Sequence, residues 1–206
     1  LYYSNHVFSH DKSLIWVPVA GLVAVFLPFF VVVYATFKGL YRFKIYKITL
    51  KNEALKNLRI VQISDLHLGS FNSQYKVFDR AVKMINDLEP DYIFFTGDLV
   101  NNYAWELIGW EETFKNLKAK KGKFSILGNH DYGDYSTWKN PEEKSFNFET
   151  IKDFHRKIGF KLLLNEAVTI RANSREIALV GVENWGKPPF MQYGDLSKAL
   201  VSVQDI

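Results

Sequence analysis

One uncharged stretch of 25 residues constrains this chain more than any other feature. Residues Ser13 to Phe37 carry no charged side chain and consist mainly of Leu, Ile, Val, Ala and Phe. A helix needs roughly 20 predominantly apolar residues to cross the hydrocarbon core of a bilayer, so this stretch is long enough. We therefore predict a transmembrane helix over residues 13–37, kinked or locally broken at Pro18 and Pro28, with residues 1–12 as a tail or an inter-helix loop.

Two other readings of this stretch fit less well. A core helix of a soluble domain rarely stays uncharged over so many turns. A cleaved signal peptide has an apolar region of only about 7–15 residues with basic residues before it. In this chain the basic residues follow the apolar stretch.

Basic side chains gather directly after the apolar stretch. Residues 38–59 contain a single acid, Glu53, and seven basic residues: Lys38, Arg42, Lys44, Lys47, Lys51, Lys56 and Arg59. The whole chain has a net charge of only +4, so the rest of it is slightly acidic. Lys and Arg are retained on the cytoplasmic side of a membrane, so we expect the larger C-terminal part to face the cytoplasm. A nucleic-acid partner would need a basic face across the folded domain, and none is expected.

Composition describes the remainder as an ordinary globular domain. Hydrophobic residues make up 48% and charged residues 23% of the chain, which excludes wholesale disorder. The chain has no cysteine. This excludes a disulfide scaffold, a thiol nucleophile, a cysteine-bound zinc ion and an iron–sulfur cluster.

Apolar periodicity predicts alternating strands and helices after the membrane segment. A basic juxtamembrane linker over residues 38–58 would hold a first strand at 43–50, and residues 132–144 read as one long polar loop. Strand–helix–strand alternation predicts an α/β domain with a largely parallel sheet, and the closely spaced last strands look antiparallel. The further predicted strands are 59–64, 92–96, 123–127, 161–164, 167–171 and 176–182, and the predicted helices are 75–88, 105–117 and 146–158.

Metal-binding residue types follow three successive predicted strands. Asp65 and His67 follow the first, Asp98 follows the second, and Asn129-His130-Asp131 follows the third. Ligands of open α/β sheets bind at the carboxyl ends of the strands, so we expect these side chains to meet. Carboxylate, amide and imidazole donors suit Mn, Fe or Zn.

The spacing of these residues suggests a role for each. In extended chain Asp65 and His67 project to one side while Leu66 points into the core, so the pair can hold one metal ion. The carboxylate of Asp98 has two oxygens and can bridge two metal ions. Asn129 adds a neutral oxygen, and His130 need not be a ligand, because it could meet a leaving-group oxygen.

These motifs resemble the first three motifs of the calcineurin-like metallophosphoesterase family. Within that family the sequence resembles the membrane-anchored bacterial branch that includes UDP-2,3-diacylglucosamine hydrolases. The resemblance implies a four-layer α/β sandwich with two sheets over residues 59–206, an inner-membrane location and two divalent metal ions. It also implies a role for each motif residue: Asp65 and His67 on the first ion, Asp98 bridging, Asn129 on the second ion, His130 as the catalytic histidine and Asp131 orienting His130.

Two later histidine motifs of the family have no counterpart here. Of the five histidines, His6 and His10 precede the apolar stretch, and His155 lies on the apolar side of a predicted helix, where a structural role is expected. The sequence is therefore expected to be a fragment that is incomplete at its C-terminus and inactive by itself.

The function implied by the resemblance is hydrolysis of a phosphodiester or pyrophosphate bond by a hydroxide that two metal ions activate. A lipid-linked or membrane-proximal phosphoester is the expected substrate. The apolar loop over residues 184–191 would contact lipid or pack on its own domain. Two alternatives stay open: a membrane-tethered nucleotide phosphodiesterase, and a catalytically degenerate binding scaffold.

Overall fold

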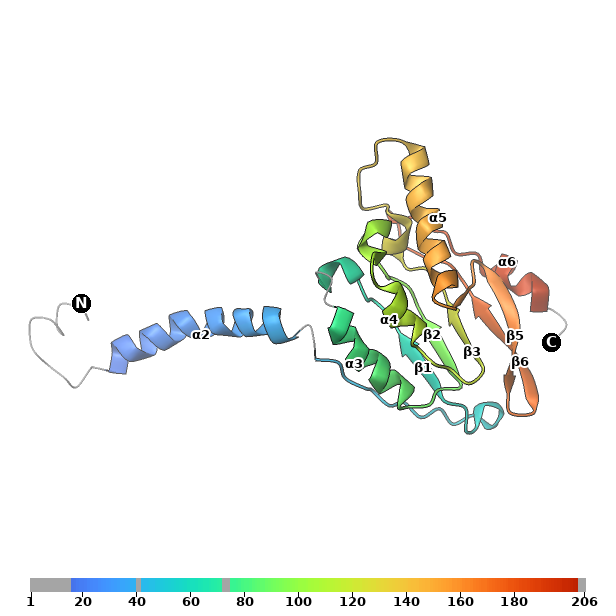
Figure 1. Ribbon diagram of the computed structural model, residues 1–206, viewed down its shortest axis with the longest axis horizontal. Coiled ribbons are helices and arrows are strands. Elements are labelled where there is room, and N and C mark those ends of the chain that lie inside the picture. Colours follow the sequence, from blue (N-terminus) through green and yellow to red (C-terminus); the bar gives the residue numbers. More distant parts are fainter. Residues whose placement is uncertain (1–15, 40–41, 72–74, 204–206) are drawn as a thin grey trace, which may run out of the picture. The chain divides into compact units, whose positions relative to one another are not determined.

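The computed structural model describes residues 16–39, 42–71 and 75–203, and the chain divides into two compact units, Leu1–Lys47 and Ile48–Ile206. In the first unit, the described residues include helix α2 (Trp16–Lys38), drawn in blue in Figure 1. Its residues 16–36 are long and apolar enough to cross a membrane, and almost all of its side chains are exposed. Residues 1–15, which include the expected tail, lie outside the described residues.

Helix α2 is continuous from Trp16 to Lys38, so of the expected kink or local break at the prolines, the break is wrong. Pro18 occupies the first turn, where an amide would lack a helical partner in any case. Pro28 lies inside the helix and does not end it.

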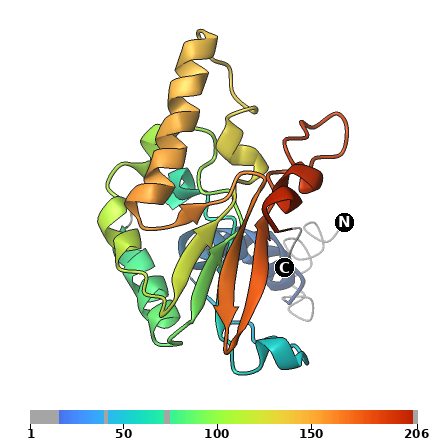
Figure 2. The same cartoon turned by 90° about the vertical axis from the view of Figure 1, so that its right-hand side faces the viewer.

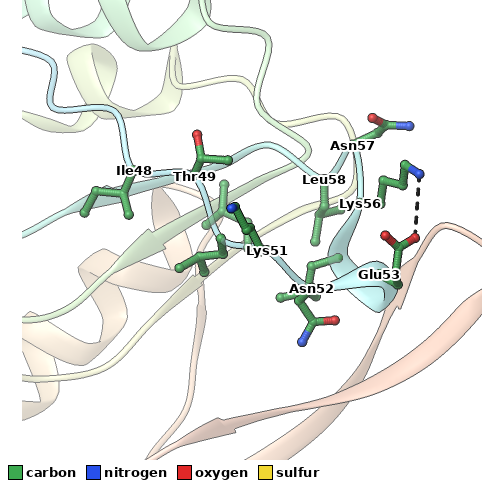
Figure 3. Close-up of a pocket in the computed structure, with 11 residues that line it drawn as sticks. Ile48, Thr49, Lys51, Asn52, Glu53, Lys56, Asn57 and Leu58 are labelled. Atoms are coloured by element: carbon green, nitrogen blue, oxygen red, sulfur yellow. Dashed lines mark ion pairs between the residues drawn. The ribbon is translucent and has the colours of Figure 1, made fainter.

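Residues 42–50 form no strand, which corrects the prediction of a first strand at 43–50. Three of the four apolar side chains that suggested it are exposed, Ile45 at 46%, Ile48 at 83% and Leu50 at 71%. No strand of the described residues is paired with this segment, and alternation without a partner strand does not make a sheet. Residues 48–60 instead curl around a surface hollow of about 630 Å³, beside an ion pair of Lys56 with Glu53 on the short 3-10 helix η3 (Glu53–Leu55) (Figure 3).

A parallel sheet of four strands forms the centre of the second unit. Its strands are adjacent in sequence order: β1 (Ile60–Ile63), β2 (Tyr92–Phe95), β3 (Gly122–Ser125) and β4 (Lys161–Leu162). Right-handed crossovers between strands in sequence order place every connecting helix on the same face. Figure 1 shows α3 (Tyr75–Asn86), α4 (Glu111–Lys115) and α5 (Pro141–Lys157) on that face.

Two of the predicted helices differ from the structure by more than two residues. The helix expected over 105–117 is two short pieces, η5 (Ala104–Leu107) and α4, because Gly109 adopts a left-handed φ of 84° between them. Helix α5 starts before the predicted 146, because the Asn140 side chain accepts a 2.8 Å hydrogen bond from the Glu143 amide and Pro141 follows the cap. The polar loop expected over 132–144 is therefore shorter.

A second, antiparallel sheet covers the other face of the first (Figure 2). It consists of β5 (Glu166–Ala172) and β6 (Arg175–Gly181), and α6 (Leu196–Leu200) contacts β5. The Tyr92 hydroxyl of β2 joins the sheets by donating a 3.0 Å hydrogen bond to the Arg171 carbonyl. The α/β class with two sheets and a parallel core is thus confirmed.

Candidate metal centre

The loops after β1 and β2 run side by side beyond the ends of their strands. The Asp65 amide donates to the Gly97 carbonyl at 3.0 Å, and the His67 amide donates to the Asp98 carbonyl at 3.1 Å. These bonds extend the pairing of the two strands past the sheet. They bring the first two motifs together, as expected from their positions at the carboxyl ends of strands.

The backbone of these motifs is left-handed and not extended. Asp65, His67 and Asp98 have φ values of 55°, 46° and 58°. The prediction that Asp65 and His67 project from an extended segment is therefore wrong. Leu66 is only half-buried, and the core residue here is Leu68, which is 1% exposed.

Two glycines allow the second and third motifs to approach. Gly97 has a φ of 99°, and a Cβ atom there would collide with the backbone of Gly128. A Cβ atom on Gly128 would collide with the Asp98 carboxylate. Only a pair of glycines lets these backbones pass so closely.

Three potential ligand atoms converge at this end of the sheet. One donor atom from each of His67, Asp98 and His130 lies within 4.8 Å of the others. His67 Nε2 is 3.9 Å from Asp98 Oδ2, which is too far for a hydrogen bond. Neither atom is therefore occupied by a hydrogen bond to the other, and both can act as metal ligands. The two imidazole rings meet edge to face, with centroids 4.7 Å apart. An imidazole and carboxylate donor set of this kind fits Mn, Fe or Zn.

The other two expected ligands are Asp65, which is not part of this group, and Asn129, which directly precedes His130 in the chain. The Asp65 side chain is exposed and accepts a hydrogen bond from the Ser64 hydroxyl. The Asn129 side chain donates from Nδ2 to the Tyr135 hydroxyl at 2.9 Å. This bond leaves the amide oxygen of Asn129 available as a donor atom.

A backbone carbonyl sets the tautomer of His130. His130 Nδ1 lies 2.7 Å from the Asn101 carbonyl oxygen, which can only accept. The proton of a neutral ring therefore sits on Nδ1, and Nε2 carries the lone pair. The His130 amide donates to Asp98 Oδ1 at 3.0 Å, which leaves Oδ2 of that carboxylate toward His67.

Asp131 braces the loops rather than the His130 ring. It is completely buried, and its carboxylate accepts hydrogen bonds from the backbone amides of Asp98, Leu99, Val100 and Gly128 at 2.8–3.2 Å. Burial raises the pKa of Asp131 to about 7, although the amide donors favour the ionised form. The His130 ring is oriented by the carbonyl oxygen of Asn101. The hydrogen bonds of the Asp131 carboxylate go to backbone amides, so no direct contact supports the expectation that Asp131 orients His130.

Three residues that shape the site were not singled out from the sequence. Tyr135 contacts both Asn129 and the His130 ring, whose centroid is 4.9 Å from its own. Glu106 is buried and accepts hydrogen bonds from four amides of the surrounding loops, those of Gly69, Asn101, Asn102 and Tyr103. Asn101 acts through its carbonyl oxygen. No residue-type pattern predicts a backbone contact of this kind.

Comparisons with known proteins agree with this arrangement. The model of the family described as calcineurin-like phosphoesterase matches residues 58–200. A "Transmembrane protein with metallophosphoesterase domain" from Danio rerio is 33% identical over 108 residues, which cover 52% of this chain and 24% of the relative. An uncharacterized metallophosphoesterase from Aquifex aeolicus is 30% identical over 148 residues, covering 70% of this chain and 50% of the relative.

The bacterial branch also contains relatives with a named activity. The "UDP-2,3-diacylglucosamine pyrophosphatase LpxG" of Chlamydia trachomatis is 45% identical over 83 residues, 39% of this chain and 25% of that protein. The chain thus spans half or less of the length of these relatives.

Proposed function

Since the chain belongs to the calcineurin-like phosphoesterase family, we propose that it hydrolyses a phosphodiester or pyrophosphate bond with the help of divalent metal ions. The observation that carries the proposal is the convergence of His67, Asp98 and His130 at the carboxyl ends of adjacent parallel strands. Asp65 and Asn129, on the same loops, would complete the donor set for two ions, with Asp98 between them. Mn, Fe and Zn are the ions that this donor set favours.

The chemistry divides between the ions and the side chains. When bound, such ions supply Lewis acidity toward phosphoryl oxygens and lower the pKa of bound water toward ~7. The role of His130 is to supply a proton to the leaving group. The Asn101 carbonyl holds a proton on Nδ1, so a proton taken up on Nε2 is the one that can pass to the departing oxygen.

We further propose a lipid-linked or membrane-proximal substrate and a cytoplasmic catalytic domain. The similarity to LpxG and the apolar helix α2 support the first part. The basic residues that follow the helix support the second. Reporter fusions after residue 60 test the orientation: green fluorescent protein should be bright and alkaline phosphatase inactive, and the reverse result would place the domain outside the cytoplasm.

The activity itself is tested with the protein expressed from its entire reading frame. Purified protein should hydrolyse bis-p-nitrophenyl phosphate when Mn²⁺ is added, and Asp98→Asn should abolish both hydrolysis and metal binding. Metal binding without hydrolysis of any phosphoester would favour the binding scaffold. Preference for nucleotides over lipid-linked pyrophosphates would favour the tethered nucleotide phosphodiesterase.

Neither the structure nor the relatives support the expectation that residues 1–206 alone are inactive. Assaying them beside the full-length protein measures that directly.

A further inference from the structure

The loop between β6 and α6 exposes apolar side chains on a well-fixed base. Figure 2 shows this loop standing out from the second unit. The side chains of Trp185, Phe190 and Met191 are exposed by 66%, 54% and 57%. Single exposed apolar residues are common in soluble proteins. Here three of them fall within residues 185–191, together with exposed Lys187 and without any acidic residue.

The base of the loop is closed by backbone hydrogen bonds. The Asn184 carbonyl accepts from the amides of Tyr193 and Gly194 at 2.9 and 3.0 Å, and Trp185 forms an antiparallel bridge with Gln192. The Gln192 side chain also donates to the Gly186 carbonyl at 2.7 Å. The loop therefore keeps its form without packing its apolar side chains inward.

Side chains tie this base to the domain. Glu183 accepts hydrogen bonds from the Tyr132 hydroxyl at 2.9 Å and from the Asn165 amide at 2.6 Å. The Tyr193 ring stacks on Tyr132 at a centroid distance of 3.9 Å, and its hydroxyl donates to Asp134 at 2.7 Å. A loop whose base is fixed to the domain and whose tip is apolar can bury that tip in an apolar environment outside the protein.

The tip lies next to the candidate metal centre. The Phe190 ring centroid is 6.4 Å from that of Tyr135, and the Tyr135 ring contacts His130. Whatever covers this loop therefore also approaches the site where a phosphoester would be cleaved.

We propose that residues 185–191 insert into the interfacial layer of a lipid bilayer and hold the metal centre at the bilayer surface. Tryptophan, phenylalanine and lysine are the residues that favour this layer, where rings bury their apolar part and lysine stays near anionic headgroups. The inference rests on the proposed membrane location. Nine residues, 39–47, follow α2 before the second unit begins, and nine extended residues span at most about 30 Å. A bilayer that holds α2 is therefore within reach of the second unit.

The test measures quenching of Trp185 by brominated phospholipids. Full-length protein is reconstituted into phosphatidylethanolamine–phosphatidylglycerol vesicles with and without brominated acyl chains. Trp185→Phe should remove part of the quenched emission, whereas Trp105→Phe, which removes a tryptophan with a similar exposure of 63%, should leave it unchanged. Equal quenching in the parent and in Trp185→Phe would overturn the proposal.

A second variant pair separates insertion from mere proximity. Phe190→Glu places a charge at the tip and should reduce quenching of Trp185, while Phe146→Glu, at a 75% exposed position on α5, should not. Quenching that appears only after a lipid substrate is added, or only with another protein, would also overturn bilayer insertion. Hydrolysis of soluble bis-p-nitrophenyl phosphate needs no bilayer, so a failure here is distinguishable from a failure of the proposed function.

Discussion

The Asp131 carboxylate accepts a 2.9 Å hydrogen bond from the backbone amide of Asp98, on the loop of the neighbouring strand. The same oxygen accepts from Gly128, and the other oxygen accepts from Leu99 and Val100. One buried side chain thus fixes the backbone of two motifs. The position of the Asp98 carboxylate depends on a residue that contacts no expected ligand atom.

Asp131→Asn should unfold the second unit more easily. An amide offers one acceptor oxygen and turns an NH₂ group toward amides that also donate, so about two buried donors lose their partner. We expect a loss of roughly 2–5 kcal/mol in the free energy of unfolding. Urea unfolding at pH 8, above the pKa of about 7, measures it with the carboxylate ionised. Asp153→Asn, at an exposed ion pair with Arg156, is the control and should change stability little.

Tyr135→Phe should weaken metal binding without unfolding the protein. The Tyr135 hydroxyl holds the Asn129 amide nitrogen, so its loss frees the amide to rotate its oxygen away from a metal ion. One lost hydrogen bond of about 0.5–1.5 kcal/mol corresponds to roughly a two- to tenfold weaker affinity. Titration calorimetry with Mn²⁺ measures it. Tyr75→Phe also removes a hydroxyl, one that donates to the Ile108 carbonyl, and should leave the affinity unchanged. If both variants bind equally well, Asn129 is not positioned by Tyr135.

The sequence predicted most of the strands and the parallel core well, because runs such as Tyr92–Phe95 are apolar, β-branched or aromatic and end at a glycine turn. It failed at residues 43–50, where the alternation is present but no partner strand is, and at Gly109, where one left-handed residue divides a helix. An apolar pattern in the sequence shows only the preference of a segment for a strand or a helix. Whether a strand finds a partner strand is decided by the tertiary fold.

Part of the candidate site could likewise be predicted from the sequence, and part of it could not. Strand-end placement brought Asp98, His67 and His130 together as predicted, since parallel strands share one carboxyl edge. The left-handed backbone at His67 and the hydrogen bond of His130 to a carbonyl oxygen were not predictable, because both depend on which loops lie side by side.

His130→Ala should slow hydrolysis while the metal ions stay bound, if His130 handles the leaving-group proton. The expected loss is roughly 10²–10⁴-fold for a poor leaving group and smaller for p-nitrophenolate, which needs little protonation. His67→Ala is the matched variant and should lower metal content. Elemental analysis and kinetics on both substrates decide between the roles. The ring of His130 lies with His67 and Asp98 in the group that could hold a metal ion. Loss of metal from His130→Ala would therefore identify His130 as a ligand, and equal slowing of both substrates would identify it as a structural residue.

His155 should make the stability of the second unit sensitive to acid. It is completely buried on α5 beside Phe95, neither ring nitrogen has a hydrogen-bond partner among the described residues, and burial lowers its pKa to about 3. In the unfolded chain a histidine titrates near pH 6.5. Between these two values the unfolded state binds the proton, so the free energy of unfolding falls as the pH drops below about 6.5, by up to about 1.4 kcal/mol per pH unit. Above that range the contribution of His155 is constant.

Two substitutions separate this titration from packing. His155→Phe and His155→Leu change the fit of the core by different amounts, but the packing contribution to the free energy of unfolding in each variant is the same at pH 8 and pH 5. Neither side chain binds a proton, so both variants should lose about 2 kcal/mol less than the parent between these two pH values. Urea unfolding at both pH values, followed by circular dichroism, measures the difference. An unchanged pH difference in both variants would mean that His155 is protonated in the folded protein, and that a partner for its charge forms when the pH falls.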